Sequence, residues 1–351
     1  MPTTVRRYAL CAILIASACS KKSANQGPPP ELTGLAAVPS SADVVLGVDV
    51  DKLASSPIVE RAVEQLLMRD TQLRESWELV RDGCKIDVRK QVRRVMVALG
   101  PTAPDSRVGT GPVLMIATGS LTEAELASCV RSLVGKGGGT LTAKPLGGRT
   151  LYLVKETNRT MYFAFGRADT VVLGTNEAYV TEALGPGKKA LDNPELAGWI
   201  KLADQNAPVW AVGRVSERVR LGLVKVTEGK LSAGPAAFVG SLDPSEGAKV
   251  DLGAVMVSPA DAKQLESQAK AQLATLAMVA QLKSLGHLVQ KLAISVDANV
   301  VRFRAALTMD DVNHLLSMLD GRAPPAQDSP PAPATGSGSG TAQPAQPRPS
   351  P

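Results

Sequence analysis

A valine-rich strand that leads into a serine and then into a helical pattern occurs twice in this chain. The first strand is predicted over 42–50 and the second over 207–215. In each half, two further strands, a capped helix and a closing hairpin or meander follow in the same order. This repeated order predicts an internally duplicated arrangement of two lobes. Chance similarity between ordinary α+β segments is the alternative.

Capping residues mark where the predicted helices begin. Ser56 stands before Pro57, a residue suited to the first turn of a helix. Thr122 and Glu125 have the spacing of a capping box. In the second half, Ser216 opens a shorter helix. These starts divide the helical patterns from the strands that precede them.

Short connections between the predicted strands favour antiparallel pairing, and the helices do not alternate strictly with strands. We therefore predict an α+β fold, with antiparallel sheet or sheets and helices packed on one face, in an internally duplicated two-lobe arrangement. One continuous sheet shared by both halves is the alternative. The predicted boundaries are a signal peptide (1–18), a flexible tether (19–38), a first lobe (39–184), a connecting segment (185–206), a second lobe (207–322) and a disordered tail rich in Pro, Gly and Ser (323–351).

The first residues indicate export. Arg6 and Arg7 precede an apolar run that is too short to cross a bilayer as a helix, which needs about 20 residues. The run ends in Ala16-Ser17-Ala18-Cys19, which resembles the lipobox of bacterial lipoproteins. The resemblance implies that Cys19 is acylated and anchors the mature chain to a membrane. The same residues also fit an ordinary secretory cleavage site, which would leave Cys19 bare.

Ser20 stands where an aspartate would imply retention in the inner membrane, so the lipoprotein resemblance implies the outer membrane, facing the periplasm. A secreted or periplasmic soluble protein is the alternative. Of the four cysteines, Cys11 leaves with the signal and Cys19 is the lipidation candidate. Cys84 and Cys129 remain, and leftover thiols in an exported chain usually pair, so we predict a disulfide between them. Two separately buried free cysteines are the alternative.

The sequence shows no catalytic, cofactor or metal motif. The two histidines, His287 and His314, lie on separate segments, and we predict both to be solvent-facing or helix-end residues rather than ligands. The glycine-rich stretches lack the spacing of dinucleotide or phosphate loops, and no GxSxG elbow occurs. We predict no cofactor, no metal and no enzymatic activity.

The densest basic cluster runs from Arg81 to Arg94 and contains acids but no aromatic residue, so it lacks the stacking platform of a single-strand binder. We predict no nucleic acid partner and interpret the cluster as a solvated face, with an anionic lipid or polymer surface as the alternative.

Residues 42–53 and 119–133 are similar to uncharacterised, alanine-rich envelope lipoproteins of the myxobacterial kind, a resemblance that implies no activity. We therefore predict a non-enzymatic, lipid-anchored envelope protein that binds or scaffolds a partner, through an exposed apolar or charged patch. Its partners would be the membrane, through lipidated Cys19, and an envelope protein. One alternative is a carrier of a lipid or other apolar molecule, with a cavity lined by Val, Leu and Met. Another is an enzyme with an unrecognised site.

Overall fold

The computed structural model describes residues 32–102, 111–227, 231–282 and 286–319. The predicted signal peptide, Cys19, the tether up to residue 31 and the tail 323–351 lie outside the described residues.

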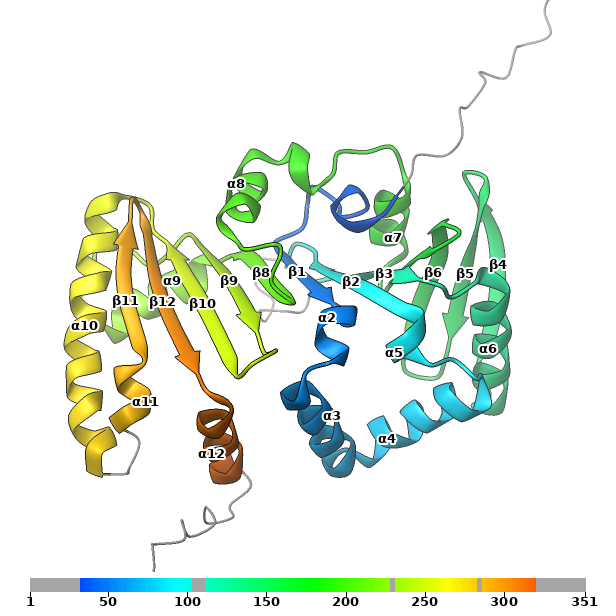
Figure 1. Ribbon diagram of the computed structural model, residues 1–351. Coiled ribbons are helices and arrows are strands. Elements are labelled where there is room, and N and C mark those ends of the chain that lie inside the picture. The colour runs from blue at the N-terminus through cyan, green and yellow to red at the C-terminus, as the bar shows by residue number, and fades with distance from the viewer. Residues whose placement is uncertain (1–31, 103–110, 228–230, 283–285, 320–351) are drawn as a thin grey trace, which may run out of the picture.

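The described residues form one antiparallel sheet of twelve strands in the order β11-β12-β10-β9-β8-β1-β2-β3-β7-β6-β5-β4 (Figure 1). This confirms the predicted α+β class. The strands are β1 (Val44–Asp49), β2 (Val92–Leu99), β3 (Val113–Gly119), β4 (Thr140–Leu146), β5 (Arg149–Lys155), β6 (Thr160–Arg167), β7 (Thr170–Gly174), β8 (Val209–Arg214), β9 (Ala237–Asp243), β10 (Ala248–Val255), β11 (Leu292–Asp297) and β12 (Val300–Leu307).

Helices occupy the intervals between strands. They are η1 (Gly34–Ala36), α2 (Val50–Ala54), α3 (Pro57–Arg69), α4 (Thr71–Glu78), the π-helix η2 (Leu79–Gly83), α5 (Val88–Gln91), α6 (Glu123–Lys136), α7 (Glu177–Leu184), η3 (Ala190–Asp192), α8 (Pro194–Leu202), α9 (Glu217–Val226), α10 (Pro259–Leu282), α11 (Gly286–Gln290) and α12 (Met309–Leu319).

The strand order is symmetric about the pair formed by β1 and β8. From this pair, β2 and β3 follow outward on one side, and β9 and β10 follow on the other. Helix α6 follows β3 in the chain, and α10 follows β10. The two halves therefore share one continuous sheet, the arrangement that the sequence left as an alternative.

Helices cover both faces of this sheet. On the first face, α7 and α8 bury the main core, which includes Val45, Leu114, Val212 and Ile200, each at most 1% exposed. On the second face, two smaller clusters lie under α6 and under α10. The second face is thus covered near the two ends of the sheet.

Two segments that the sequence placed outside the lobes belong to the main core. Leu32 and Val38, in the predicted tether, are at most 2% exposed. Leu196 and Ile200, in the predicted connecting segment, lie on α8 and are 1% exposed. These few apolar side chains pack on the first face of the sheet. Their burial stabilises the two segments, although the residues around them are polar and rich in proline.

Candidate binding site

The middle of the second face is apolar at every position of five neighbouring strands. We call this surface the central apolar face. Cross-strand pairing aligns its side chains in three rows, because directly paired residues of an antiparallel sheet point to the same side. The rows are Val113-Leu99-Val44-Gly213-Phe238, Met115-Val97-Leu46-Ala211-Gly240 and Ala117-Val95-Val48-Val209-Leu242.

The central apolar face is only half buried. Met115 is 37% exposed and Phe238 is 38% exposed, whereas Val45, on the opposite side of the same sheet, is 0% exposed. Figure 1 shows α6 and α10 at opposite ends of the molecule, which leaves the middle strands between them. An antiparallel sheet that faces water normally alternates apolar and polar residues. This face has the apolar composition of a covered surface, but no helix among the described residues covers it.

Two glycines keep the central apolar face flat. A Cβ atom at Gly213 would lie 2.7 Å from the Phe238 ring, and one at Gly240 would lie 2.9 Å from the Leu252 side chain. The larger side chains therefore lie across the glycines. Leu252, on β10 beside the central apolar face, is 53% exposed.

An apolar cavity of about 520 Å³ adjoins the central apolar face on the side of the first half. Leu173 lines the cavity and pairs directly with Met115 of the central apolar face. The volume lies in the range of small-molecule sites, about 300–1,000 Å³. Its apolar lining comes from η2 (Leu79, Val80), α6 (Leu126, Val130, Leu133, Val134) and the sheet (Val154, Met161, Phe163, Leu173).

A disulfide between Cys84 and Cys129 joins two walls of this cavity. The two Cα atoms are 5.1 Å apart, and the bond closes a sequence separation of 45 residues. Cys84 directly follows η2, and Cys129 lies on α6 between the cavity-lining residues Leu126 and Val130. The pairing predicted from the export signal is confirmed, and it positions η2 against α6.

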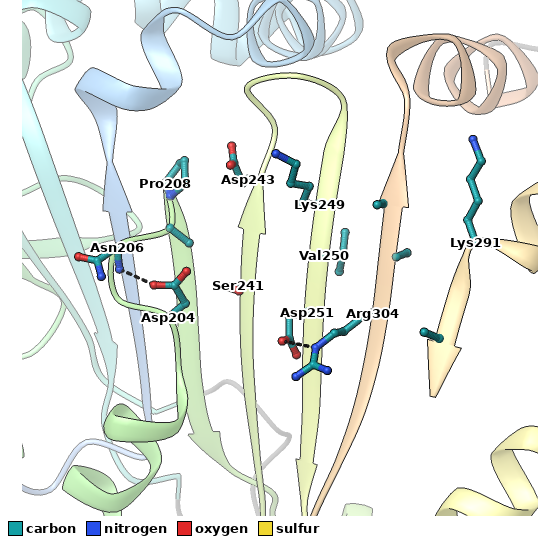
Figure 2. A pocket seen from close by; sticks show the side chains of 14 residues that line it. Asp204, Asn206, Pro208, Ser241, Asp243, Lys249, Val250, Asp251, Lys291 and Arg304 are labelled. Atoms are coloured by element: carbon teal, nitrogen blue, oxygen red, sulfur yellow. Dashed lines mark hydrogen bonds and ion pairs between the residues drawn. The ribbon is translucent and has the colours of Figure 1, made fainter. Parts of the chain in front are cut away.

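A polar trough of about 500 Å³ lies on the first face, over β9 to β12 (Figure 2). Asp251 accepts a hydrogen bond of 2.9 Å from the Arg304 Nε atom. Lys249 is paired in register with Asp243, and a hydrogen bond from the Ser245 hydroxyl lowers the pKa of that carboxyl. Asp251 and Asp243 thus face cations, and the trough has the character of a solvated sheet surface.

The structure brings the two histidines together, which the sequence did not predict. Their ring centroids are 6.2 Å apart, and His287 Nε2 lies 3.2 Å from Asp311 Oδ1. Half-exposed His287 is near the start of α11, as expected. His314 lies within α12, and its Nε2 atom is buried with no hydrogen-bond partner among the residues that the structure describes. The solvent-facing or helix-end prediction is therefore wrong for His314. Across the described ranges, no three His, Cys, Asp or Glu residues are grouped so as to hold a metal ion.

Asp311 organises the surroundings of these histidines. Its carboxylate accepts hydrogen bonds from the Lys291 ammonium and from the Thr308 amide and hydroxyl groups. The Lys291 contact is the main cause that holds the Asp311 pKa far below its usual value. No sequence signal pointed to this cluster, because α11 and α12 are separated by a hairpin and share no helical spacing.

Acids within the basic cluster neutralise part of its charge. Arg81 donates to Asp82 at 2.8 Å, and Lys90 lies 3.3 Å from Asp87. Both contacts are solvent-exposed, so each contributes little to stability.

Comparisons with known proteins add little to this site. No protein-family model and no curated protein matches the chain. Crystal form I of TP0453 is similar to it, with a TM-score of 0.43 and 12% sequence identity, over 83% of this chain and 98% of that chain. At this TM-score the likeness carries no argument about the present chain. None of the described helices combines the length and the apolar character needed to span a bilayer.

Proposed function

We propose that this chain is a lipid-anchored protein of the cell envelope that binds long apolar chains, such as those of lipids. The observation that carries the proposal is the apolar cavity between α6, η2 and the sheet, which adjoins the half-exposed central apolar face. The lining by Leu, Val and Met is the feature expected of a carrier rather than of a scaffold. The lipobox-like residues before Cys19 support attachment to the membrane, most simply the outer membrane.

The energetics favour a long chain over a short one. Each methylene moved out of water contributes about 0.8 kcal/mol. Micromolar binding corresponds to about 8 kcal/mol, and association itself costs about 4 kcal/mol or more. A bound chain therefore needs about 15 methylenes in contact with apolar surface. The cavity and the central apolar face together offer this contact, since Leu173 and Met115 make them adjacent.

A cavity-filling variant tests the proposal. Val130→Trp adds a bulky side chain inside the cavity, whereas Leu276→Trp adds the same side chain on α10 at a position that is 57% exposed. We expect delipidated Val130→Trp to bind a fluorescent long-chain probe at least tenfold more weakly than the parent protein, and Leu276→Trp to bind it normally. Circular dichroism checks that both variants are folded. Equal binding by both variants would reject the cavity as the binding site.

The central apolar face also supports a second candidate function, the docking of an envelope protein partner. Leu46 lies at the middle of this face and is half-buried. If a protein docks there, Leu46→Lys abolishes co-purification of the partner from solubilised envelope, while Leu276→Lys and a deletion of 323–351 leave it intact. Retention of the partner by Leu46→Lys would exclude this face as the docking surface.

A further inference from the structure

We infer that the apolar chain held in the cavity carries an anionic headgroup, a carboxylate or a phosphate, which lies at Lys136. This inference rests on the proposed function, because it concerns the same cavity. It specifies the chemical class of the ligand, which the apolar lining alone leaves open.

The charged groups that line the cavity have an excess of positive charge. They are Lys136, Glu156 and Arg159, which sum to a formal charge of +1 from two cations and one anion. Arg159 donates a hydrogen bond to Glu156, and this contact is the main cause that raises the Arg159 pKa. Lys136 makes no ion pair within the part of the chain that the structure describes. Its ammonium group is therefore the charge available to a ligand.

The end of α6 places Lys136 at the rim of the cavity. Lys136 is the last residue of the helix, and Gly137 donates to the carbonyl oxygen of Val134 at 3.1 Å. Gly139 donates to the same oxygen at 2.9 Å, and the turn between them uses a positive φ of 73° at Gly138. These amides satisfy carbonyls of the last turn, which reduces the negative potential that an anion would meet there.

The alternatives to an anionic headgroup fit these residues less well. A cationic headgroup needs a free carboxylate, but Arg159 already occupies Glu156. A neutral headgroup can accept a hydrogen bond from the ammonium group of Lys136 but gains no attraction between opposite charges. Lysine binds phosphate and carboxylate alike as a compact charge.

Three probes with the same chain test the inference: hexadecanoate, hexadecyl phosphate and hexadecanol. We expect the full mature chain to bind at least one of the two anions about two- to fivefold more tightly than the alcohol, as expected for one charge contact at an exposed lysine. This preference should decline as ionic strength rises. Comparison of the two anions shows which headgroup the site prefers.

Lys136→Gln should remove the preference by weakening anion binding, with hexadecanol binding unchanged. The control Lys263→Gln, on exposed α10, should leave all three affinities as they are. Equal binding of alcohol and anions by the parent protein, or an unchanged preference in Lys136→Gln, overturns the inference and leaves the proposed function standing. Failure of all three probes to bind rejects the proposed function itself.

Discussion

Replacing both Cys84 and Cys129 by alanine should lower the free energy of unfolding by about 4 kcal/mol. The bond closes a sequence separation of 45 residues. For a loop of this length, the loop-closure relation gives about 13 cal/mol/K of unfolded-state entropy, which is about 4 kcal/mol near 25 °C. A domain's net stability is about 5–15 kcal/mol, so the loss is a large fraction of the total.

Urea unfolding of the parent and the double variant measures this difference. Trp199 and Trp210 report on the main core by fluorescence, while Trp77, on α4, lies next to η2 and reports on the cavity wall. Single-tryptophan versions of both proteins separate the two signals. The single variant Cys129→Ala provides the matched control, because it removes the bond but keeps the Cys84 side chain.

We expect the Trp77 transition to move to lower urea at least as far as the core transition, since the disulfide ties η2 to α6. Long-chain probes should also bind more weakly, because the wall is no longer held in place. A double variant within about 1 kcal/mol of the parent would refute the loop-closure argument. Unchanged probe affinity would show that the disulfide does not shape the cavity.

Three further tests, which use four substitutions, address other parts of the structure. Gly47→Ala should destabilise the protein by about 1–3 kcal/mol in urea unfolding, because a Cβ atom there would lie 2.3 Å from the indole nitrogen of Trp210; unaltered stability would contradict that packing. Val45→Thr should cost about 1–3 kcal/mol and Val48→Thr clearly less, since Val45 is 0% exposed and Val48 is half-buried on the central apolar face; equal losses would mean that this face is covered. Asp311→Asn should destabilise the protein at neutral pH by about 1–3 kcal/mol. Because the Lys291 contact lowers the Asp311 pKa, the stabilisation is present above about pH 4 and is lost as pH falls below it, so the gap between parent and variant should close on acid titration; a constant gap would contradict the assignment.

The helix starts were predictable because their signals are local. The Thr122 amide donates to the Glu125 carboxylate at 3.1 Å, and the Glu125 amide donates back to the Thr122 hydroxyl at 3.3 Å. Ser56 likewise caps α3, with Pro57 in the first turn. These interactions involve residues three apart, so spacing alone identifies them.

Strand β4 carries little sequence signal, because it does not resemble a core strand. It contains Lys144 and Pro145 and lies at the edge of the sheet. Charged residues and proline are what edge strands use to avoid further pairing. Alternation of apolar residues, the signal used for the other strands, is therefore weak there.

The central apolar face could not be recognised from the sequence for a different reason. The run Val44-Val45-Leu46 is apolar on both faces, which is the pattern of a strand covered on both sides. Whether a helix covers each face depends on strand order and on where α6 and α10 lie, and neither is a local property. The disulfide between Cys84 and Cys129 was predictable, because the export signal implies an oxidising compartment, in which two remaining thiols usually pair.

The pairing of β1 with β8 has a consequence for how the two halves of the molecule behave together. Among the twelve described strands, the hydrogen bonds between strands of different halves are those of this pair. A molecule bound on Leu46 and Ala211 contacts both strands at once. Its binding free energy is therefore lost when the two halves separate. Ligand binding at this position would therefore add its free energy to the free energy needed to separate the two halves.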